Sequence, residues 1–502
     1  MKMADTNSLE NISSLLNLSD TLKAVGGVLL NQNFDESSFC FTSVATDSRN
    51  VVEKTLFVPL IGEFQDGHAY VAQAVKSGAS AVFISKKADV KILDEIKLLA
   101  QNNKNVAFIL VENTMHALQK AAGEYVSKFP GLIRCAITGS SGKTTTKEIT
   151  ASILRQKFSV IATVGNFNSE TGLPLSVFNI RKEHELGLFE MGMNRVDEIK
   201  EIAEVFKPNY SIITNIGTAH IGILGSQKNI AKEKKNIFNH IDSEGAAFIP
   251  ACDDFAKFLA KGVKGEVVCY GEETDPAVKF ISDDGLDGTT FSVEGIEIKL
   301  ALPGRYNFIN ALGAIALARK LGVTPGQIKA GIESLKPLGG RSTLKRGKFT
   351  ILEDCYNANP DSMVKALQLS ANTKMENQKK IYVLGDMLEL GELSQKEHTN
   401  MGRIAVNSKA DLIIFFGNEM SYGFEEAVKI LNKKASLADE KLSNLRIHYI
   451  AGKDEAAISD AAKIINEYAS EGDYILLKGS RGMGLERIIP LIETKENSEA
   501  SN

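Results

Sequence analysis

A glycine-rich turn between an apolar strand and a helix is the feature of this 502-residue chain that most restricts its fold. Residues 132–138 form a mostly apolar run typical of a buried strand, and the sequence TGSSGKTT occupies residues 138–145. Glycines in such a turn let backbone N–H groups point at phosphate oxygens, and the N-terminus of the following helix favours negative charge. The segment predicts a phosphate loop on an α/β sheet, with a simple turn at a helix start as the alternative.

Two side chains of this loop suit ATP and a divalent cation. The Lys143 ammonium can neutralise charge on the β- and γ-phosphates, and the Thr144 hydroxyl can bind Mg²⁺. Ile137 stands where the general pattern has a glycine, five residues before Gly142, so we expect a shorter variant of the loop. The expected nucleotide contacts are Gly139, Ser140, Ser141, Gly142, Lys143, Thr144 and Thr145.

Strand and helix patterns alternate along much of the chain, which predicts an α/β fold with mostly parallel, doubly wound sheets. At about 150 residues per domain, the length favours about three domains. Pro130-Gly131 breaks the pattern after a helical stretch at 115–129, and residues 337–340 (PLGG) resemble a linker. The expected domains are a small α/β domain at 1–112, a central P-loop-type ATPase domain at 113–336 and a C-terminal Rossmann-like, doubly wound domain at 337–502.

Local patterns predict several elements. Ser394 opens an S-x-x-E pattern, so a capping box and a helix start are expected there. Asn359 as N-cap and Pro360 as the first helical residue predict another start. A helix that begins near Tyr306 is expected to end at Gly322. Buried strands are expected at 106–111, 132–138, 187–190, 211–216, 349–352, 381–384, 412–416, 448–451 and 474–477.

The overall composition excludes some classes of protein. The net charge is -4 at pH 7, so we expect no general attraction to nucleic acid or to an anionic membrane. No apolar run approaches the ~20 residues of a membrane span, and the N-terminal segment lacks a signal-peptide pattern, so the expected compartment is the cytoplasm. The five cysteines are dispersed without a CxxC pair, which argues against a disulfide framework and a cysteine-built zinc site.

Polar side chains follow two central strands. Glu190 ends the strand expected at 187–190, and His220 follows the strand expected at 211–216. Both then lie on the same rim of the sheet as the phosphate loop, where a carboxylate and an imidazole could bind or support Mg²⁺. Ordinary loop-edge residues are the equal alternative. Lys234 lies in the lysine-rich segment 228–235, which by itself indicates a solvated helix face.

Two segments of the third domain also follow strands. In DCYNANP, at residues 354–360, a turn and helix cap account for Asn359 and Pro360 but leave Asp354 and Asn357 without a role. The sequence KGSRG at 478–482 is a second basic, glycine-rich loop. It suits an anionic group, with a bare turn as the alternative.

Together these motifs resemble the Mur ligase family and, within it, the MurF-type branch. The likeness runs from residue 46 to residue 486, with motifs in each expected domain. The YNANP and GDM strings favour this branch. The motifs are TDSR at 46–49, LIG at 60–62, DGH at 66–68, the phosphate loop, the stretch ending at His220, GS at 225–226, AK at 231–232, DCYNANP at 354–360, LGDMLELG at 384–391 and KGSR at 478–481.

The resemblance assigns roles that spacing does not. Lys234 matches a lysine that CO₂ carbamylates in the family and that helps to hold Mg²⁺. The implied metal-associated residues are Thr144, Glu190, His220 and Lys234, and the implied catalytic residues are Lys143, Glu190, His220, Lys234 and Arg341. Further implied ATP contacts are Asn307, Arg341 and Asp354. Implied substrate contacts are Thr46, Asp47, Ser48, Arg49, Asn166, Asn168, Thr171, Asn357 and Asn359. Ser169 and Asn236 stand where the family usually has asparagine and glutamate.

The activity that the resemblance implies is ATP-dependent ligation of D-alanyl-D-alanine to UDP-N-acetylmuramoyl-tripeptide through an acyl phosphate, in peptidoglycan synthesis. The implied cofactors are ATP, Mg²⁺ and a carbamate on Lys234. A monomer that acts on small molecules is expected, and the third domain is expected to close on ATP, because Asn307 precedes the linker whereas Arg341 and Asp354 follow it.

Two alternatives to this activity remain at the level of sequence. One is another ligase of the same architecture, of the MurE or folylpolyglutamate synthase type, against which the NANP string at 357–360 weighs. The other is a P-loop nucleotide-binding module without ligase activity. The presence of Lys143, Glu190 and His220 together weighs against that module.

Overall fold

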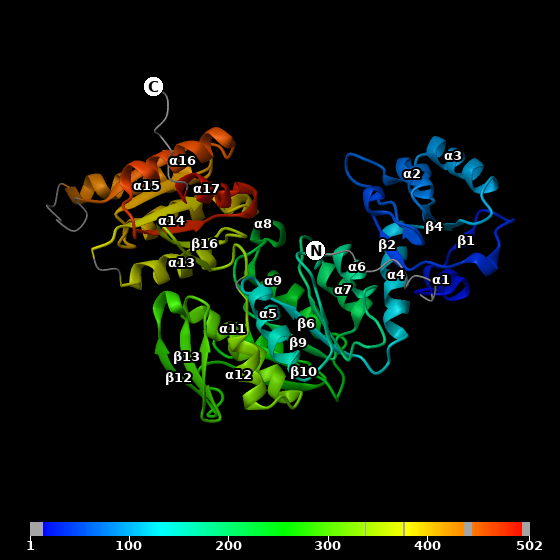
Figure 1. Cartoon of the computed structure of the whole chain (residues 1–502), viewed down its shortest axis with the longest axis horizontal. Helices are drawn as coiled ribbons and strands as arrows, with labels where there is room; N and C mark the ends of the chain where they lie inside the picture. The colour runs from blue at the N-terminus through cyan, green and yellow to red at the C-terminus, as the bar shows by residue number, and fades with distance from the viewer. Residues whose placement is uncertain (1–13, 337, 375–376, 436–443, 494–502) are drawn as a thin grey trace, which may run out of the picture.

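The chain folds into three lobes, and the N-terminal and C-terminal lobes lie on opposite sides of the central one (Figure 1). The computed structural model describes residues 14–336, 338–374, 377–435 and 444–493. Each lobe is built on its own main sheet, so the expected three-domain α/β architecture is confirmed. The domain boundaries stay predictions, and Pro337 of the expected linker lies outside the described residues.

The N-terminal lobe holds a five-stranded sheet of order β1-β5-β4-β3-β2, parallel except for β1. Its strands are β1 (Val28–Leu29), β2 (Ser43–Ala45), β3 (Thr55–Phe57), β4 (Ala79–Ser85) and β5 (Ala107–Val111), and its helices include α1 (Leu18–Val25), α2 (Val71–Lys76) and α3 (Val90–Gln101). The strand expected at 106–111 is β5. Strands β4 and β5 are almost fully buried, as apolar strands of a parallel sheet covered on both faces are.

Helix α4 (Thr114–Ser127) links the N-terminal and central lobes. The Asn113 side chain caps its start by accepting the N–H of His116. The helix packs against α1 on one side and against α6 (Gly172–Val177) and α7 (Glu198–Phe206) on the other, within one continuous apolar core. It corresponds to the helix expected at 115–129, and it brings the N-terminal lobe against the loops around α6 and α7.

The central lobe is a six-stranded, fully parallel sheet of order β11-β10-β9-β6-β8-β7. Its elements include β6 (Ile133–Thr138), α5 (Lys143–Leu154), β7 (Val160–Ala162), β8 (Leu186–Glu190), β9 (Tyr210–Ile213), α8 (Ile221–Leu224), α9 (Gln227–Lys235), β10 (Ala246–Pro250), β11 (Glu266–Tyr270), α11 (Arg305–Lys320) and α12 (Pro325–Glu333). The strand expected at 211–216 forms as β9 but ends at Ile213, because Asn215 and Gly217 bond to the phosphate loop instead of to a neighbouring strand.

A three-stranded antiparallel sheet extends the central lobe. It is not among the strands expected from the sequence. It consists of β12 (Val278–Asp283), β13 (Thr289–Val293) and β14 (Ile296–Leu300). Glu294 and Gly295 join the last two strands with φ of 51° and 82°, as a two-residue hairpin turn requires. Helix α12 packs against β14.

The C-terminal lobe has a six-stranded sheet of order β15-β16-β20-β17-β18-β19, parallel except for the β15–β16 pair. Its elements include β15 (Thr343–Arg346), β16 (Thr350–Asp354), α13 (Pro360–Asn372), β17 (Lys380–Gly385), α14 (Ser394–Val406), β18 (Leu412–Phe416), α15 (Met420–Ala435), β19 (Arg446–Ile450), α16 (Glu455–Tyr468), β20 (Tyr474–Lys478) and α17 (Ile488–Glu493). The strands expected in this domain all form.

Two of the expected helix caps have different outcomes. Asn359 caps α13 with Pro360 at its first position, as predicted. The capping box at Ser394 is wrong: a 3₁₀ turn, Gly391–Leu393, runs directly into α14, so Ser394 is already helical. Its hydroxyl donates to Glu419 instead.

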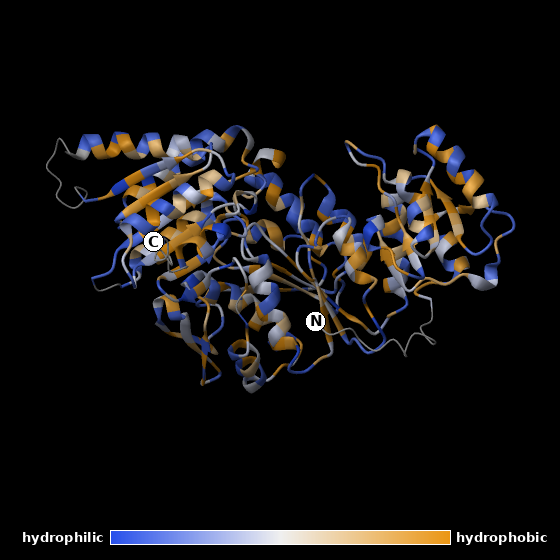
Figure 2. Cartoon of the chain, turned by 45° about the horizontal axis from the view of Figure 1, so that its top comes forward, coloured by the Kyte–Doolittle hydropathy of each residue, from blue (hydrophilic) through white to orange (hydrophobic). Residues whose placement is uncertain are grey.

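Apolar residues follow the strands inside each lobe, whereas the helices present hydrophilic residues outward (Figure 2). The sheets therefore form the cores, and the loops at the carboxyl ends of their strands are left to carry polar side chains. None of the helices in the described part of the chain combines the length and apolar character needed to cross a membrane.

Candidate active site

The glycine-rich turn after β6 has the geometry of a phosphate loop. Gly139 and Gly142 have φ of 153° and 79°. A Cβ on Gly139 would lie 1.8 Å from Thr214 Oγ1, and a Cβ on Gly142 would lie 2.5 Å from Asn310 Oδ1. Both positions therefore require glycine. Lys143, the first residue of α5, donates to the Gly139 carbonyl at 2.9 Å.

Neighbouring loops hold the phosphate loop in this shape. The Asn215 carbonyl accepts from the Ser140 N–H at 3.0 Å, and its side chain accepts from the Ser141 N–H at 2.8 Å. Asn215 was not singled out from the sequence. It lay inside the motif that ends at His220, but only the fold shows that its amide faces the loop.

A carboxylate faces the loop from the end of β8. Glu190 Oε2 accepts from the Thr144 hydroxyl at 2.7 Å, and Oε1 accepts from Asn168 Nδ2 at 2.8 Å. Thr163 Oγ1 accepts from the Glu190 N–H at 2.9 Å. The strand end thus places Glu190 beside the first turn of α5, as its position on the rim predicted.

These groups open onto a cavity of about 800 Å³ between the central and C-terminal lobes. Loops from both sides of the linker line it, so neither lobe alone forms it. The predicted site residues in its wall are Ser140, Ser141, Gly142, Lys143, Thr144, Thr145, Asn166, Asn168, Glu190, His220, Asn307, Arg341, Asp354, Asn357 and Asn359. Residues that sequence reasoning did not select also line it, including Asn215, Asn310, Tyr356, Asp361, Lys365 and Glu389.

Lys143 is the cation at the centre of this wall. Burial lowers its pKa, the charge of Glu190 raises it, and Arg341 lowers it further. A phosphate group in the cavity would favour the charged form of Lys143 by adding negative charge beside it. The loop therefore holds a cation whose charge is best compensated when an anion is bound.

The C-terminal lobe contributes an ordered polar wall. Asp354, at the end of β16, pairs with Lys478 Nζ at 2.9 Å and accepts from the Ser342 N–H at 3.1 Å. Lys478, which is almost fully buried, also donates to the Asn357 carbonyl at 2.8 Å. The charge of Lys478 in the second basic loop is therefore paired within the protein. For this residue, the pairing favours a structural turn over a binding site for an anionic ligand.

Arg341 lies immediately after the linker. Its guanidinium lies 3.9 Å from the centre of the Tyr356 ring, and Arg481 approaches the same ring at 5.8 Å. Stacking on Tyr356 holds the Arg341 side chain while its charge faces the cavity.

Helix α13 brings its N-terminus to the phosphate loop. Asn359 Oδ1 accepts from the Ser362 N–H at 2.9 Å, and Asn359 Nδ2 donates to Ser141 Oγ at 3.1 Å. The same side chain is therefore a helix cap and a contact between lobes. Asn357 Oδ1 accepts from the Ala358 N–H at 2.9 Å within the turn.

Two further contacts join the lobes beside the cavity. Asp361 accepts from the Thr218 N–H at 3.1 Å, and His220 Nδ1 lies 2.9 Å from Glu389 Oε2. His220 and Glu389 both have positive φ, 63° and 65°, which non-glycine residues adopt only where the surroundings hold them. His220 lies in the cavity wall, but its described partner is Glu389 rather than Glu190.

Lys234, on α9, is fully buried, and its Nζ has no hydrogen-bond partner in the described structure. Burial holds its pKa well below the usual range, and the nearby charge of Lys143 lowers it further, against smaller opposing effects of Glu233 and Glu190. The solvated-face interpretation of this residue is therefore wrong. The amine does not line the cavity, but it lies close enough to Lys143 and Glu190 for their charges to act on it.

Asn307 and Asn310 lie together on α11. Asn307 Nδ2 donates to the Pro303 carbonyl at 2.8 Å, and its Oδ1 accepts from Asn310 Nδ2 at 3.1 Å. Asn307 is almost fully buried at the cavity wall.

Several expected substrate residues lie away from the cavity. The residues 46–49 belong to the N-terminal lobe, where the exposed Arg49 guanidinium holds the pKa of Asp47 at about 2. The Thr171 hydroxyl faces Met115 Sδ of α4 at 3.7 Å. Ser169 Oγ accepts from the Gly172 N–H at the start of α6.

A phosphate loop with a facing carboxylate, in a cavity completed by a second α/β domain, defines a class of nucleotide-using enzymes whose domains share one site. Family models agree over most of the chain: "Mur ligase family, catalytic domain" matches residues 41–126, "Mur ligase middle domain" matches 137–318 and "Mur ligase, glutamate ligase domain" matches 340–481. The chain belongs to the Mur ligase family.

Particular relatives are ligases of one kind. The UDP-N-acetylmuramoyl-tripeptide–D-alanyl-D-alanine ligase of Treponema pallidum is 41% identical over 453 residues, which are 90% of this chain and 94% of that protein. The enzyme of the same name from Bacillus subtilis is 34% identical and covers 94% of this chain and 97% of that protein.

Solved structures agree over nearly the whole chain. MurF from Acinetobacter baumannii aligns with a TM-score of 0.80 at 28% identity, covering 95% of this chain and 98% of that one. MurF ligase from Thermotoga maritima, solved in complex with ADP, aligns with a TM-score of 0.71 at 26% identity, covering 90% and 97%.

Proposed function

We propose that this chain is an ATP-dependent ligase that joins D-alanyl-D-alanine to UDP-N-acetylmuramoyl-tripeptide in peptidoglycan synthesis. The observation that carries the proposal is the cavity in which the phosphate loop and Glu190 of the central lobe face the Asp354–Pro360 segment of the C-terminal lobe. Relatives named as this ligase match the chain along almost its full length.

The chemistry follows from the substrates. Joining a carboxylate to an amine is unfavourable in water, so ATP first transfers its γ-phosphoryl group to the carboxylate and gives an acyl phosphate and ADP. The dipeptide amine then attacks the acyl carbon, a C–N bond forms, and phosphate leaves. Because two anions must be brought together, catalysis depends on positioning and on charge compensation. Lys143 and Arg341 supply the positive charge, and closure of the lobes excludes water.

The residues beside the phosphate loop fit a magnesium ion. Thr144 and Glu190 place two oxygen donors together, and among the described residues no group of three or more His, Cys, Asp or Glu side chains could hold a metal alone. This pattern suits a cation that takes its other ligands from phosphate oxygens and water. When bound, Mg²⁺ neutralises charge on the β- and γ-phosphates. Thr144 and Glu190 would hold it, with His220 at the same rim.

The buried, unpartnered amine of Lys234 fits a carbamate. Only a deprotonated amine reacts with CO₂, and burial favours that form by lowering the pKa of Lys234. A carbamate would place negative oxygen atoms in this buried region, where the charge of Lys143 would compensate them.

The lobes divide the remaining tasks. We assign the UDP-sugar to the N-terminal lobe, through the expected contacts at residues 46–49. We assign the muramoyl peptide to the space between the lobes, through Asn166, Asn168 and Thr171. We assign the dipeptide to the C-terminal lobe, through Asn357 and Asn359. Asn307 and Asp354 are assigned to ATP. We expect a cytoplasmic monomer, since ATP and a UDP-linked precursor are the substrates.

Mass spectrometry of the products tests the proposal. Enzyme is incubated with ATP, D-alanyl-D-alanine and, separately, UDP-tripeptides that carry diaminopimelate or lysine. A UDP-pentapeptide formed only when all three substrates are present supports it. Ligation of a free amino acid instead would indicate the MurE or folylpolyglutamate synthase type, and nucleotide binding without product would indicate a non-catalytic module.

A further inference from the structure

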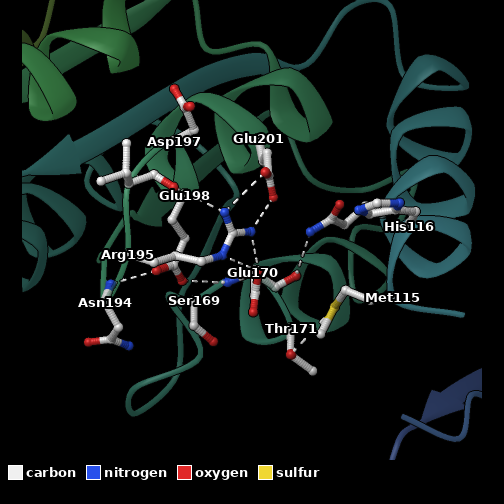
Figure 3. Close-up of polar contacts among 12 residues, drawn as sticks. Met115, His116, Ser169, Glu170, Thr171, Asn194, Arg195, Asp197, Glu198 and Glu201 are labelled. Atoms are coloured by element: carbon white, nitrogen blue, oxygen red, sulfur yellow. Dashed lines mark hydrogen bonds and ion pairs between the residues drawn. The ribbon is translucent and has the colours of Figure 1, made fainter. Parts of the chain in front are cut away.

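Glu198, the first residue of α7, is a buried carboxylate with two backbone partners. Its side chain is 2% exposed. Oε1 accepts from the Glu170 N–H at 3.0 Å, and Oε2 accepts from the Asn194 N–H. Glu170 belongs to the loop before α6, and Asn194 belongs to the loop after β8. One carboxylate therefore joins two loops that are far apart in sequence (Figure 3).

The same two loops meet again at the cavity. Asn168 Nδ2 donates to Glu190, and the Asn168 carbonyl accepts from the Gly192 N–H at 2.8 Å. Two residues beyond Asn168 the first loop reaches Glu198, and two residues beyond Gly192 the second loop does so as well. The Glu190–Asn168 contact thus lies at one end of a pair of loops whose other end Glu198 fixes.

Helix α7 is itself anchored, so it can serve as a fixed support. Glu233, a buried residue of α9, accepts from the Asp197 N–H at 2.9 Å and from the Ile199 N–H at 2.8 Å. A carboxylate at a helix N-terminus satisfies N–H groups that have no partner within the helix. Glu233 precedes Lys234, so the same anchor ties α7 to the helix that carries the buried lysine.

The outer side of the loops carries a second, more exposed network. Arg195 pairs with Glu170 and with Glu201 of α7 (Figure 3). These side chains are roughly one-third exposed, and such pairs contribute little to stability. Glu201 therefore provides a comparison for Glu198: it is a carboxylate on the same helix, but its partner Arg195 and its own side chain are partly exposed to solvent.

We propose that Glu198 is a positioning residue that fixes Glu190 against Thr144 by clamping the loops 165–171 and 191–197. The inference rests on the proposed function, because it assigns Glu190 to the nucleotide and its cation. Only a side chain with two acceptor oxygens can hold both N–H groups at once. Without it, two partly buried N–H groups lose their partner and the Glu190–Asn168 end of the loops is free to shift.

The test is Glu198→Gln, with Glu201→Gln as the matched control on the same helix. Glutamine keeps the size but turns one acceptor into a donor, so one loop N–H is left facing an NH₂ group. We expect kcat for ligation to fall about 10- to 100-fold, as changes to outer partners of a metal site do, with KM for ATP changed less than about threefold. The increase in ADP affinity that Mg²⁺ gives in the wild type, measured by calorimetry, should shrink by a similar factor. Glu201→Gln should leave both quantities unchanged.

Other outcomes overturn the proposal. A lower melting temperature with unchanged kcat per folded enzyme and an unchanged Mg²⁺ effect on ADP affinity would make Glu198 merely structural. If Glu198→Gln does not fold, hydrogen exchange on the wild type decides: the amides of Glu170 and Asn194 should exchange slowly and together, and rapid exchange of either one contradicts a clamp. The ADP and exchange measurements do not depend on which substrates are ligated, so failure of the proposed function is seen separately, as absence of UDP-pentapeptide with the wild type.

Discussion

At the scale of single residues, Lys143 shows that a buried lysine in the phosphate loop can favour anion binding without stabilising the fold. Its ammonium is bonded to the loop's own Gly139 carbonyl, and burial lowers its pKa. Because its pKa is lower in the folded than in the unfolded chain, the charged form of Lys143 lowers the free energy of unfolding. This destabilisation is complete at pH values below the folded pKa and disappears as the pH rises from the folded to the unfolded pKa. The charge is thus retained for ligand binding rather than for stability.

Lys143→Ala should therefore separate activity from stability. We expect turnover to fall by at least ~10²-fold, because one preorganised charge is lost from the transferring phosphoryl group. The melting temperature should stay the same or rise slightly. Steady-state kinetics and thermal unfolding measure the two effects. Wild-type turnover in Lys143→Ala would mean that this loop is not the ATP site.

Lys234 offers a second residue-scale prediction. Lys234→Ala should be nearly inactive, and a short carboxylic acid that fills the space should restore part of the activity. Enzyme equilibrated with ¹³C-labelled bicarbonate should give a carbamate carbon signal in NMR, because burial lowers the pKa of the amine and so favours the deprotonated form that reacts with CO₂.

The adjacent Lys235 is the control for this substitution. Its Nζ donates to the Phe258 carbonyl at 2.8 Å on the protein surface, so Lys235→Ala removes a lysine from the same helix without touching the cavity. It should keep both the activity and the carbamate signal. A carbamate signal that persists in Lys234→Ala would assign the modification elsewhere.

Local pattern found the residues that a strand or a helix terminus places directly, such as Lys143 and Glu190. It could not find Asn215 or Glu389, because their roles depend on loops meeting across the fold. Lys234 shows the opposite limit: the sequence of its helix indicates a charged surface, and only the packing of α9 against α7 and α8 shows that the amine is buried.

At the scale of elements, the residue that caps helix α13 also contacts the phosphate loop. Asn359 caps the helix and also reaches Ser141 Oγ. Asn359→Ala should cost about 1 kcal/mol of stability, as loss of an N-cap does, and should also raise KM for ATP or lower kcat. Denaturant unfolding and kinetics measure the two effects.

Asp454, the N-cap of α16, is the matched control. It accepts from the Ala457 N–H at 2.9 Å and does not line the cavity. Asp454→Ala should cost a similar amount of stability with unchanged kinetics. Equal kinetics for both variants would show that Asn359 is only a cap.

Elements also show where local rules succeed and where they fail. The cap at Asn359 was predictable because an extended residue precedes a proline at the first helical position. The S-x-x-E pattern at Ser394 failed because the preceding turn already has helical backbone angles, so no extended residue is left to act as a cap. The sheet β12–β14 does carry a local signal, in the alternation of its apolar residues and in its Glu294-Gly295 turn, but this signal differs from the strand–helix alternation of the rest of the chain.

At the scale of the whole molecule, the lobes make the site together. Asn307 lies before the linker, Arg341 and Asp354 lie after it, and all line one cavity. Separate motifs could predict that three domains exist and that two must meet. The particular contacts across the interface depend on how the lobes pack, and no local pattern contains that information.

Two glycines lie where the backbones of the central and C-terminal lobes come close together. A Cβ on Gly222, in α8, would lie 2.7 Å from Gly391 N and 2.8 Å from Leu390 C, both backbone atoms of the C-terminal lobe. Gly222 lies within regular helix, so alanine fits its own backbone and only the interface excludes it. The contact lies beside the His220–Glu389 pair, so it forms only when the lobes are together.

Gly222→Ala should therefore hinder closure without unfolding the central lobe. We expect ATP-analogue binding to be kept, kcat to fall at least about tenfold, and small-angle scattering with the analogue and UDP-tripeptide to show a larger radius of gyration than the wild type under the same conditions, because the interface backbone must move apart. Gly326→Ala, in α12, is the control: a Cβ there meets nothing within 4 Å, so kinetics and scattering should match the wild type. If Gly222→Ala reaches the wild-type compact state and turnover, the interface can yield at this point, and closure does not limit the reaction there.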